Sequence, residues 1–375
     1  MSEIDKKYFV TRPTLPSLKH YTTYLEQIWA SGIITNRGPL LQEYENKLAE
    51  HLRVEEIIVT ANATLGLMSV MRSMGLRGEV ITTPFTFAAT AGSVVWSGLE
   101  PVFVDTEPGG VNICPEAVKS AINSNTCAIL AVHCYGIPCD HEALEKISKE
   151  HGLKLIYDAC HAFGTELDGA SILELGDASV LSLHATKLVS SAEGGLIFTS
   201  DKELIDRIRL NINFGIADEN HIPEIGINAK MSELHAALGL CNLELLPSIY
   251  SERKKIDEIY RRELKNIKEI EVVSRPALTR DGFAYIPIKL ISETRYNVQD
   301  LKMYLEDKSV FSRRYFHPLL TDTCAFSMYK PTRSELLQNA VDISSRILCL
   351  PIYHGLTPSD IQLICSHIAN FFDDK

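Results

Sequence analysis

Short apolar segments rich in β-branched residues alternate with helical segments from about residue 16 to residue 240. The predicted strands are 56–60, 79–83, 100–105, 127–133, 153–158, 178–183 and 194–200. Helices are predicted at 17–32, 63–75, 86–98 and 140–152. Strands that alternate with helices in this way are typical of a mostly parallel sheet with helices on both faces. The predicted fold class is therefore α/β.

The pattern changes after about residue 240. A long helical run, 231–266, leads into a region that mixes predicted strands with predicted helices. The strands are 269–274 and 283–291, and the helices are 298–307 and 358–372. We expect a large α/β domain at 1–240 and a smaller α+β domain at 241–375, packed against each other without a linker.

Charge and composition exclude some kinds of partner. The 375 residues carry a net charge of −11, and no Lys/Arg-dense face is apparent, so nucleic acid is not expected as a partner. The start, "MSEIDKKYFV", lacks the apolar core of a secretory signal, and no apolar run is long enough to cross a membrane. The cysteines are nine in number and scattered, which predicts reduced thiols in the cytoplasm.

A zinc site is the alternative that one group of these cysteines raises. Cys134 and Cys139 lie near His133, His141 and Cys160 in the sequence. The chain has neither a C-x-x-C pair nor a matching second half, so we expect no metal.

The stretch "SLHATKLVSSAEGG" (182–195) places Lys187 among small and hydroxylic residues, just ahead of two glycines. A solvated loop lysine is one interpretation. The other is a partly desolvated amine of lowered pKa, which is suited to Schiff-base chemistry.

Other polar and aromatic residues follow predicted strands, where open α/β folds bind ligands. In "TANATLGL", Ala63 and Thr64 begin a helix whose free N–H groups would bind phosphate, although Asn62 or Thr64 could serve only as a cap. Asp158 ends a strand, with His161 three residues later, and either binds a ligand cation or caps a turn.

Two aromatic residues follow the strand at 79–83. In "ITTPFTFAATAG", Phe85 or Phe87 would either stack on a flat ring or pack in the core. A phosphate-binding helix start, a strand-end acid and a reactive lysine are together the groups that pyridoxal 5′-phosphate requires.

Four segments in order carry a family resemblance: "DACHAFGTELDG", "SLHATKLVSSAEGGLIFTS", "GINAKMSELHAALGLCNLE" and "RRYFHPL". They are similar to the DegT/DnrJ/EryC1/StrS family of sugar aminotransferases, and the resemblance extends from about Leu18 to the end of the chain. It implies the aspartate-aminotransferase-like fold, known as fold type I of the pyridoxal-phosphate-dependent transferases. It also implies a homodimer whose active sites lie at the subunit boundary.

The resemblance assigns roles to particular residues. Lys187 matches the lysine that binds the cofactor covalently, Asp158 matches the partner of the pyridine nitrogen, and His161 lies near the ring hydroxyl. The remaining cofactor contacts that it implies are Ala63, Thr64 and Ser182 at the phosphate, Phe87 stacked on the ring, and Asn228 reaching the phosphate of the other subunit. Expected substrate contacts are His184, Glu193 of the E-G-G turn, Arg313, Tyr315 and His317.

The reaction and its substrates are also implied by the resemblance. A dehydratase branch of the family has His in place of Lys187, so the lysine favours transamination. The donor would be L-glutamate and the acceptor a nucleotide-linked keto-sugar. "HATK" followed by "EGG" is more similar to members that aminate C4 than to the C3-acting members. This favours conversion of dTDP-4-keto-6-deoxy-D-glucose to dTDP-4-amino-4,6-dideoxy-D-glucose for O-antigen synthesis. UDP- and GDP-linked 4-keto-sugars stay open as alternatives, as does a protein that binds the cofactor or a ligand without turnover.

Overall fold

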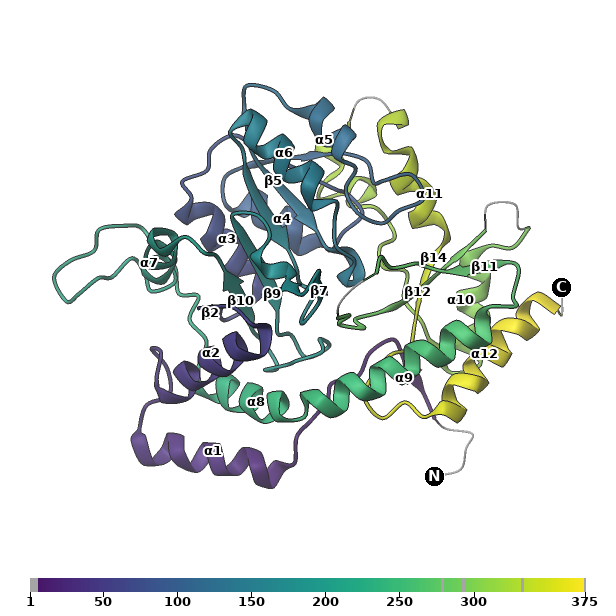
Figure 1. The fold of residues 1–375 in the computed structure, drawn as a ribbon, viewed down its shortest axis with the longest axis horizontal. Helices are drawn as coiled ribbons and strands as arrows, with labels where there is room; N and C mark the ends of the chain where they lie inside the picture. The colour runs from purple at the N-terminus through teal and green to yellow at the C-terminus, as the bar shows by residue number, and fades with distance from the viewer. Residues whose placement is uncertain (1–5, 278–279, 292–294, 332–333, 374–375) are drawn as a thin grey trace.

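The computed structural model describes residues 6–277, 280–291, 295–331 and 334–373. Its largest sheet has the strand order β2-β10-β9-β6-β5-β3-β4 (Figure 1). Strand β10 is antiparallel to both of its neighbours, and the other strand pairs are parallel. The strands are β2 (Ile58–Thr60), β3 (Glu79–Thr82), β4 (Glu100–Phe103), β5 (Thr126–Val132), β6 (Lys154–Asp158), β9 (Ala178–Ser182) and β10 (Gly195–Phe198). The predicted α/β class with a mostly parallel sheet is confirmed.

Helices cover both faces of this sheet. One face packs against α3 (Ala63–Ser73), α4 (Ala88–Trp96) and α7 (Lys202–Asn211). The other face packs against α2 (Pro39–Leu52), α5 (Pro115–Ala121), α6 (His141–His151) and α8 (Glu233–Glu244), with α1 (Leu18–Ser31) outside α8. Along β6, Ile156 joins the first core, whereas Leu155 and Tyr157 join the second. Burial on both faces explains why the strand segments read as continuous apolar runs.

A second, antiparallel sheet follows in the C-terminal third. It pairs β11 (Ile270–Val272), β12 (Ile286–Leu290) and β14 (Ile347–Leu350), which pack with α9 (Leu246–Leu264), α10 (Val298–Asp307), α11 (Gln338–Arg346) and α12 (Pro358–Asp373). We call this region the small lobe, and the seven-stranded sheet with its helices the large lobe. Strand β1 (Tyr8–Phe9) pairs with β13 (Val310–Phe311), so the N-terminal segment lies with the small lobe. A domain boundary at residue 240 stays a prediction.

The long helical run that joins the lobes is two helices. Helix α8 ends at Glu244 and α9 begins at Leu246, with Pro247 in its first turn. Proline is tolerated there because a first-turn N–H has no intrahelical acceptor. Figure 1 shows α8 and α9 nearly end to end beneath both lobes. Helix α9 therefore connects the large lobe to the small lobe.

Candidate active site

Lys187 lies in the loop that joins the neighbouring strands β9 and β10. The loop is folded on itself, and the Lys187 amide donates a 2.9 Å hydrogen bond to the His184 carbonyl oxygen. The lysine side chain is half-buried, and its Nζ lies 5.9 Å from the centre of the Tyr285 ring. Burial lowers the pKa of Lys187 from its ordinary value. The lowered pKa favours the neutral, nucleophilic form of this amine more than in a surface lysine.

Asp158 ends strand β6 and is 5% exposed. The hydroxyl of Thr90 donates to Asp158 Oδ2 at 2.6 Å, and the Cys160 amide donates to Oδ1 at 3.1 Å. Thr86 Oγ1 lies 2.8 Å from Thr90 Oγ1 and donates to it, because the Thr90 proton is engaged with the carboxylate. Donors on both oxygens hold the carboxylate in one orientation at the strand end.

His161 is held as a neutral ring. The amide of Tyr135 donates to His161 Nδ1 at 3.2 Å, which leaves the proton on Nε2. The imidazole stacks on Phe316, with a centroid distance of 5.9 Å and an interplanar angle of 9°. Burial, with a smaller effect of the nearby Lys187, lowers the pKa of His161 well below its usual range. His161 is therefore a hydrogen-bond donor through Nε2 at neutral pH.

The start of helix α3 provides free backbone N–H groups. Asn62 is the N-cap, and its side chain accepts from the Leu65 amide at 2.9 Å, so the capping alternative is resolved in favour of Asn62. Ala63 and Thr64 occupy the first two helical positions, whose N–H groups have no intrahelical acceptor. These donors and the helix dipole form an anion site.

Strand β10 lies against this helix start. A Cβ on Gly195 would fall 2.5 Å from the Asn62 carbonyl carbon, so only glycine permits the contact. Ser182, the register partner of Gly195, ends β9 and is 9% exposed. The sequence thus brings a hydroxyl and two free amides to one edge of the sheet. Together with the Asp158 carboxylate and the Lys187 amine, they fit the phosphate, ring nitrogen and aldehyde carbon of pyridoxal 5′-phosphate.

Two expected cofactor contacts lie at the surface of the single chain. Phe87 is 60% exposed at the N-cap of α4, whereas Phe85 is fully buried, so Phe85 is the core residue of the pair. Asn228 is exposed on the segment between α7 and α8, where its backbone bridges to Asn213 and its neighbour Ala229 is buried in the large lobe. Figure 1 shows that part of this segment extends away from the large lobe. That segment also exposes Ile222 and Ile225.

The expected substrate contacts of the lysine loop lie together. His184 Nε2 and Glu193 Oε1 are 3.7 Å apart, and both side chains are exposed. They border the same loop as Lys187, on its solvent side.

The remaining expected substrate contacts follow β13 in the small lobe. Arg313 is exposed, and its backbone pairs with Cys349 of β14. The Tyr315 ring packs edge-on against Tyr285, at 5.6 Å, and so reaches the surroundings of Lys187. His317 Nδ1 lies 3.2 Å from the Ser344 hydroxyl. We call residues 312–317 the strap; it packs against the large lobe through Phe316, which contacts Phe85 and His161.

Five further residues complete the site and were not predicted: Thr90, Tyr135, Tyr285, Phe316 and Arg253. Thr90 could have been found, because it lies one helical turn after Phe87 and therefore on the same side of α4. Tyr135 could not have been found from the sequence. Its amide reaches His161 from a left-handed backbone conformation (φ 56°), which the sequence does not indicate.

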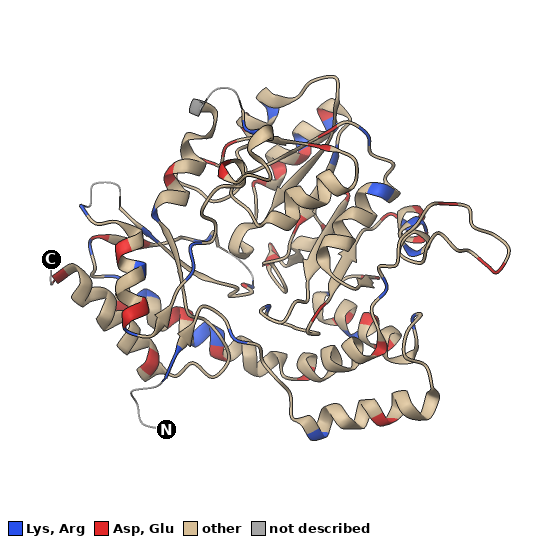
Figure 2. Cartoon of the chain, turned by 180° about the vertical axis from the view of Figure 1, so that it is seen from behind, with Lys and Arg blue, Asp and Glu red and all other residues tan. Residues whose placement is uncertain are grey.

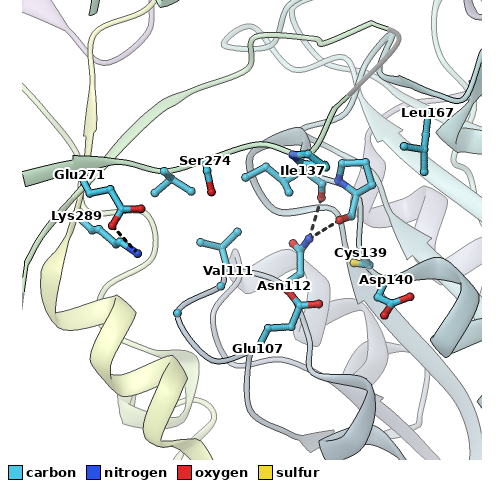
Figure 3. Close-up of a pocket in the computed structure, with 15 residues that line it drawn as sticks. Glu107, Val111, Asn112, Ile137, Cys139, Asp140, Leu167, Glu271, Ser274 and Lys289 are labelled. Carbon is cyan, nitrogen blue, oxygen red and sulfur yellow. Dashed lines mark hydrogen bonds and ion pairs between the residues drawn. The ribbon is translucent and has the colours of Figure 1, made fainter. Parts of the chain in front are cut away.

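A separate hollow of about 370 Å³ lies where the large lobe meets β11 and β12 (Figure 3). Asn112 donates there to the carbonyl oxygens of Ile137 and Pro138, and Lys289 pairs with Glu271 at 3.2 Å. These groups are engaged with one another, and none of the expected site residues lines this hollow. It belongs to the packing between the lobes.

Charge and metal-binding groups are dispersed. Lys and Arg are interspersed with Asp and Glu over both lobes (Figure 2). Within the described ranges, no cluster of three or more His, Cys, Asp or Glu could hold a metal ion. In the same part of the chain, no helix is both long and apolar enough to cross a membrane.

The fold and the site define an aminotransferase of the pyridoxal-phosphate-dependent class. Residues 18–369 match the DegT/DnrJ/EryC1/StrS aminotransferase family, and the chain belongs to that family. Its cofactor is pyridoxal 5′-phosphate.

Individual relatives align over nearly the whole chain. The chain is 43% identical over 365 residues to a dTDP-4-amino-4,6-dideoxy-D-glucose transaminase of Shigella dysenteriae, covering 97% of this chain and 99% of that protein. It is 31% identical to a GDP-perosamine synthase of Vibrio cholerae, covering 93% and 95%. Among solved structures, DesI in the presence of its TDP-sugar product superposes with a TM-score of 0.92 at 33% identity, covering 97% of this chain and 92% of DesI.

Proposed function

We propose that this protein transfers an amino group from L-glutamate to C4 of dTDP-4-keto-6-deoxy-D-glucose, giving dTDP-4-amino-4,6-dideoxy-D-glucose. The observation that carries the proposal is the 43% identity, over 97% of the chain, to a transaminase named for this product. The amino-sugar would enter a surface polysaccharide such as an O-antigen. The predominance of buried or half-buried free cysteines supports a cytoplasmic location.

When bound, pyridoxal phosphate would supply an aldehyde carbon that can carry the amino group and a ring that serves as an electron sink. Lys187 would bind the cofactor and, once released, take and return that proton at Nζ, which its lowered pKa favours. The Asp158 carboxylate, fixed by Thr90 and the Cys160 amide, would keep the pyridine nitrogen protonated. His161 would donate from Nε2 to the ring oxygen.

The cofactor phosphate would be held by two subunits. Ala63, Thr64 and Ser182 would contribute the donors of one subunit, and Asn228 of a second copy would contribute a side-chain amide. The exposed position of Asn228 at the surface of its own subunit supports this arrangement. We therefore propose a homodimer with shared active sites.

The nucleotide-sugar would lie between the lysine loop and the strap after β13. Phe87 would cover the cofactor ring, and its exposed face is available for stacking. His184 and Glu193 would contact the acceptor from the loop, and Arg313, Tyr315 and His317 from the small lobe. Arg313 supplies the positive charge that a diphosphate requires.

A GDP-linked 4-keto-sugar is the second candidate acceptor, because a GDP-perosamine synthase is 31% identical over 93% of the chain. The test is to incubate the purified protein with L-glutamate and dTDP-, UDP- or GDP-linked 4-keto-6-deoxyhexose, and to quantify each amino-sugar by mass spectrometry. We expect the dTDP sugar to be preferred in kcat/KM by about tenfold or more. Faster amination of the GDP or UDP sugar would overturn the nucleotide assignment, and no product with any of them would overturn the sugar assignment.

A further inference from the structure

Arg253 is a buried cation, and no carboxylate of the described residues forms an ion pair with it. It lies on α9, is 2% exposed, and donates from Nη1 to the Phe283 carbonyl oxygen at 3.2 Å. Its Nε is buried and makes no hydrogen bond within the part of the chain that the structure describes. Burying a guanidinium without a counter-ion is costly, so a purely structural role would be served better by a neutral side chain.

Arg275 of the same lobe, whose side chain is 9% exposed, shows the usual way of neutralising such a charge. Arg275 pairs with Asp257 at 3.0 Å and with Asp281 at 2.7 Å. For Arg253, no such ion pair exists among the described residues, although Asp257 lies one helical turn further along α9. Among the described residues, Arg275 is therefore neutralised by carboxylates of the same lobe, whereas Arg253 is not.

Arg253 and Lys187 line the same small cavity, together with Cys160, His161 and Tyr285. The phenols nearest to Arg253, Tyr250 and Tyr285, do not neutralise it, because burial raises the pKa of both and keeps them protonated. Burial lowers the pKa of Arg253 to about 10, so the guanidinium keeps its charge at neutral pH.

Three other groups that face Lys187, namely Cys160, Asp158 and Tyr315, act against burial and Arg253 and favour the charged amine. Cys160 and His161 are neutral, because burial raises the thiol pKa and lowers the imidazole pKa. Tyr315, from the strap, also keeps its proton, since burial raises its pKa. The negative charge near the amine is that of Asp158, which is engaged with Thr90 and the Cys160 amide.

We propose that Arg253 is a positioning residue whose charge, in the cavity that it shares with Lys187, disfavours the protonated form of the Lys187 amine. The proposal rests on the proposed role of Lys187 as the base of the transamination. Burial is the main cause of the lowered pKa of Lys187, and the positive charge of Arg253 is a smaller contribution in the same direction, opposed by Asp158.

The test measures the Lys187 pKa directly in the cofactor-free protein. Limiting acetic anhydride labels neutral amines, and mass spectrometry of the Lys187 peptide across pH gives the pKa without any sugar substrate. The variants are Arg253→Met, which removes the charge, Arg253→Gln, which can still donate to Phe283, and Arg253→Lys, which keeps the charge.

We expect Arg253→Met and Arg253→Gln to raise the Lys187 pKa by about one unit. Arg253→Lys should leave that pKa near the wild-type value. In Arg253→Met and Arg253→Gln, the acid limb of the pH profile of kcat with glutamate should move to higher pH by the same amount. The proposal would be overturned by an unchanged Lys187 pKa in Arg253→Met or Arg253→Gln. It would also be overturned by an equal shift of that pKa in all three variants. Because labelling needs no sugar, a wrong sugar assignment would leave this result intact.

Discussion

The hydroxyl of Thr90 donates a 2.6 Å hydrogen bond to the Asp158 carboxylate, which joins the first turn of α4 to the end of β6. Both groups are buried, so the bond is shielded from water. It connects the helix that presents Phe87 with the strand that presents the acid. Two cofactor contacts predicted separately from the sequence are thereby parts of one unit.

Thr90→Val should weaken cofactor binding without unfolding the protein. Valine keeps the shape of threonine but removes the donor, and losing a hydrogen bond to a charged group costs about 2 kcal/mol, or roughly thirtyfold in affinity. Absorbance titration with pyridoxal phosphate measures the change. Thr90→Ser retains the hydroxyl and is the matched control, so it should bind the cofactor with nearly wild-type affinity. Equal affinities of Thr90→Val and Thr90→Ser would show that this hydrogen bond does not affect cofactor binding.

Asp158→Asn should bind cofactor less tightly and lose most of its activity. The amide has the size of the carboxylate but cannot hold the pyridine nitrogen in its protonated form, so we expect a loss on the order of 10²–10³-fold in kcat. Single-turnover measurements with L-glutamate isolate the step in which the proton moves. A variant that keeps the wild-type rate in this half-reaction would refute the assigned role of Asp158.

His133 should make the fold sensitive to acid. Its ring is fully buried against Tyr157, its Nδ1 accepts from the Cys139 amide at 3.1 Å, and burial lowers its pKa to about 3. The unfolded chain binds a proton near pH 6.5 and the folded chain does not, so the stabilisation present above pH 6.5 is lost as pH falls towards 3.

The expected loss from this one group is on the order of 3 kcal/mol between pH 7 and pH 4. His133→Asn keeps an acceptor for the Cys139 amide but cannot titrate. Thermal midpoints of the two cofactor-free proteins at pH 7 and pH 4 measure the effect. The variant should lose less stability on acidification than the wild type; parallel losses would mean that His133 titrates normally in the folded protein.

Hybrid dimers test the shared active site. Lys187→Ala removes the amine of its own subunit, whereas Asn228→Ala removes a phosphate contact from the neighbouring site. A hybrid of the two places both defects in one site and leaves the other site intact. Mixing and refolding the two variants should therefore give more activity than either variant alone, in a steady-state transamination assay. Activity no higher than the average of the parents would place Asn228 in its own subunit's site or exclude the dimer.

Much of the large lobe could be predicted from the sequence, because its strands are buried on both faces and its helices have recognisable ends. Ser17 and Gly32 bound α1 as N-cap and C-cap, and Asp140 and Gly152 bound α6. The lysine loop could be located because small residues surround a lone cation. Asp158 and the helix start at Ala63 could be named as candidates because they follow strands, but their individual roles came from the family resemblance.

What sequence reasoning missed depends on contacts between distant residues. The pairing of β1 with β13 joins segments about three hundred residues apart, and neither two-residue strand has a periodicity of its own. Arg253 stands in "SERKKID", which reads as a solvated charged helix face, yet α9 turns that one arginine towards the lysine loop. Local patterns do not reveal which charge of such a run becomes buried.

The cofactor absorbance spectrum during the two half-reactions tests amino transfer at this site. We predict that the protein loaded with pyridoxal phosphate loses its cofactor band when L-glutamate is added, and that dTDP-4-keto-6-deoxy-D-glucose then restores it. Lys187→Ala should show neither change at a comparable rate. A band in the wild-type protein that L-glutamate leaves unchanged would contradict the account, because Lys187 and Asp158 would then hold a cofactor that takes no part in amino transfer.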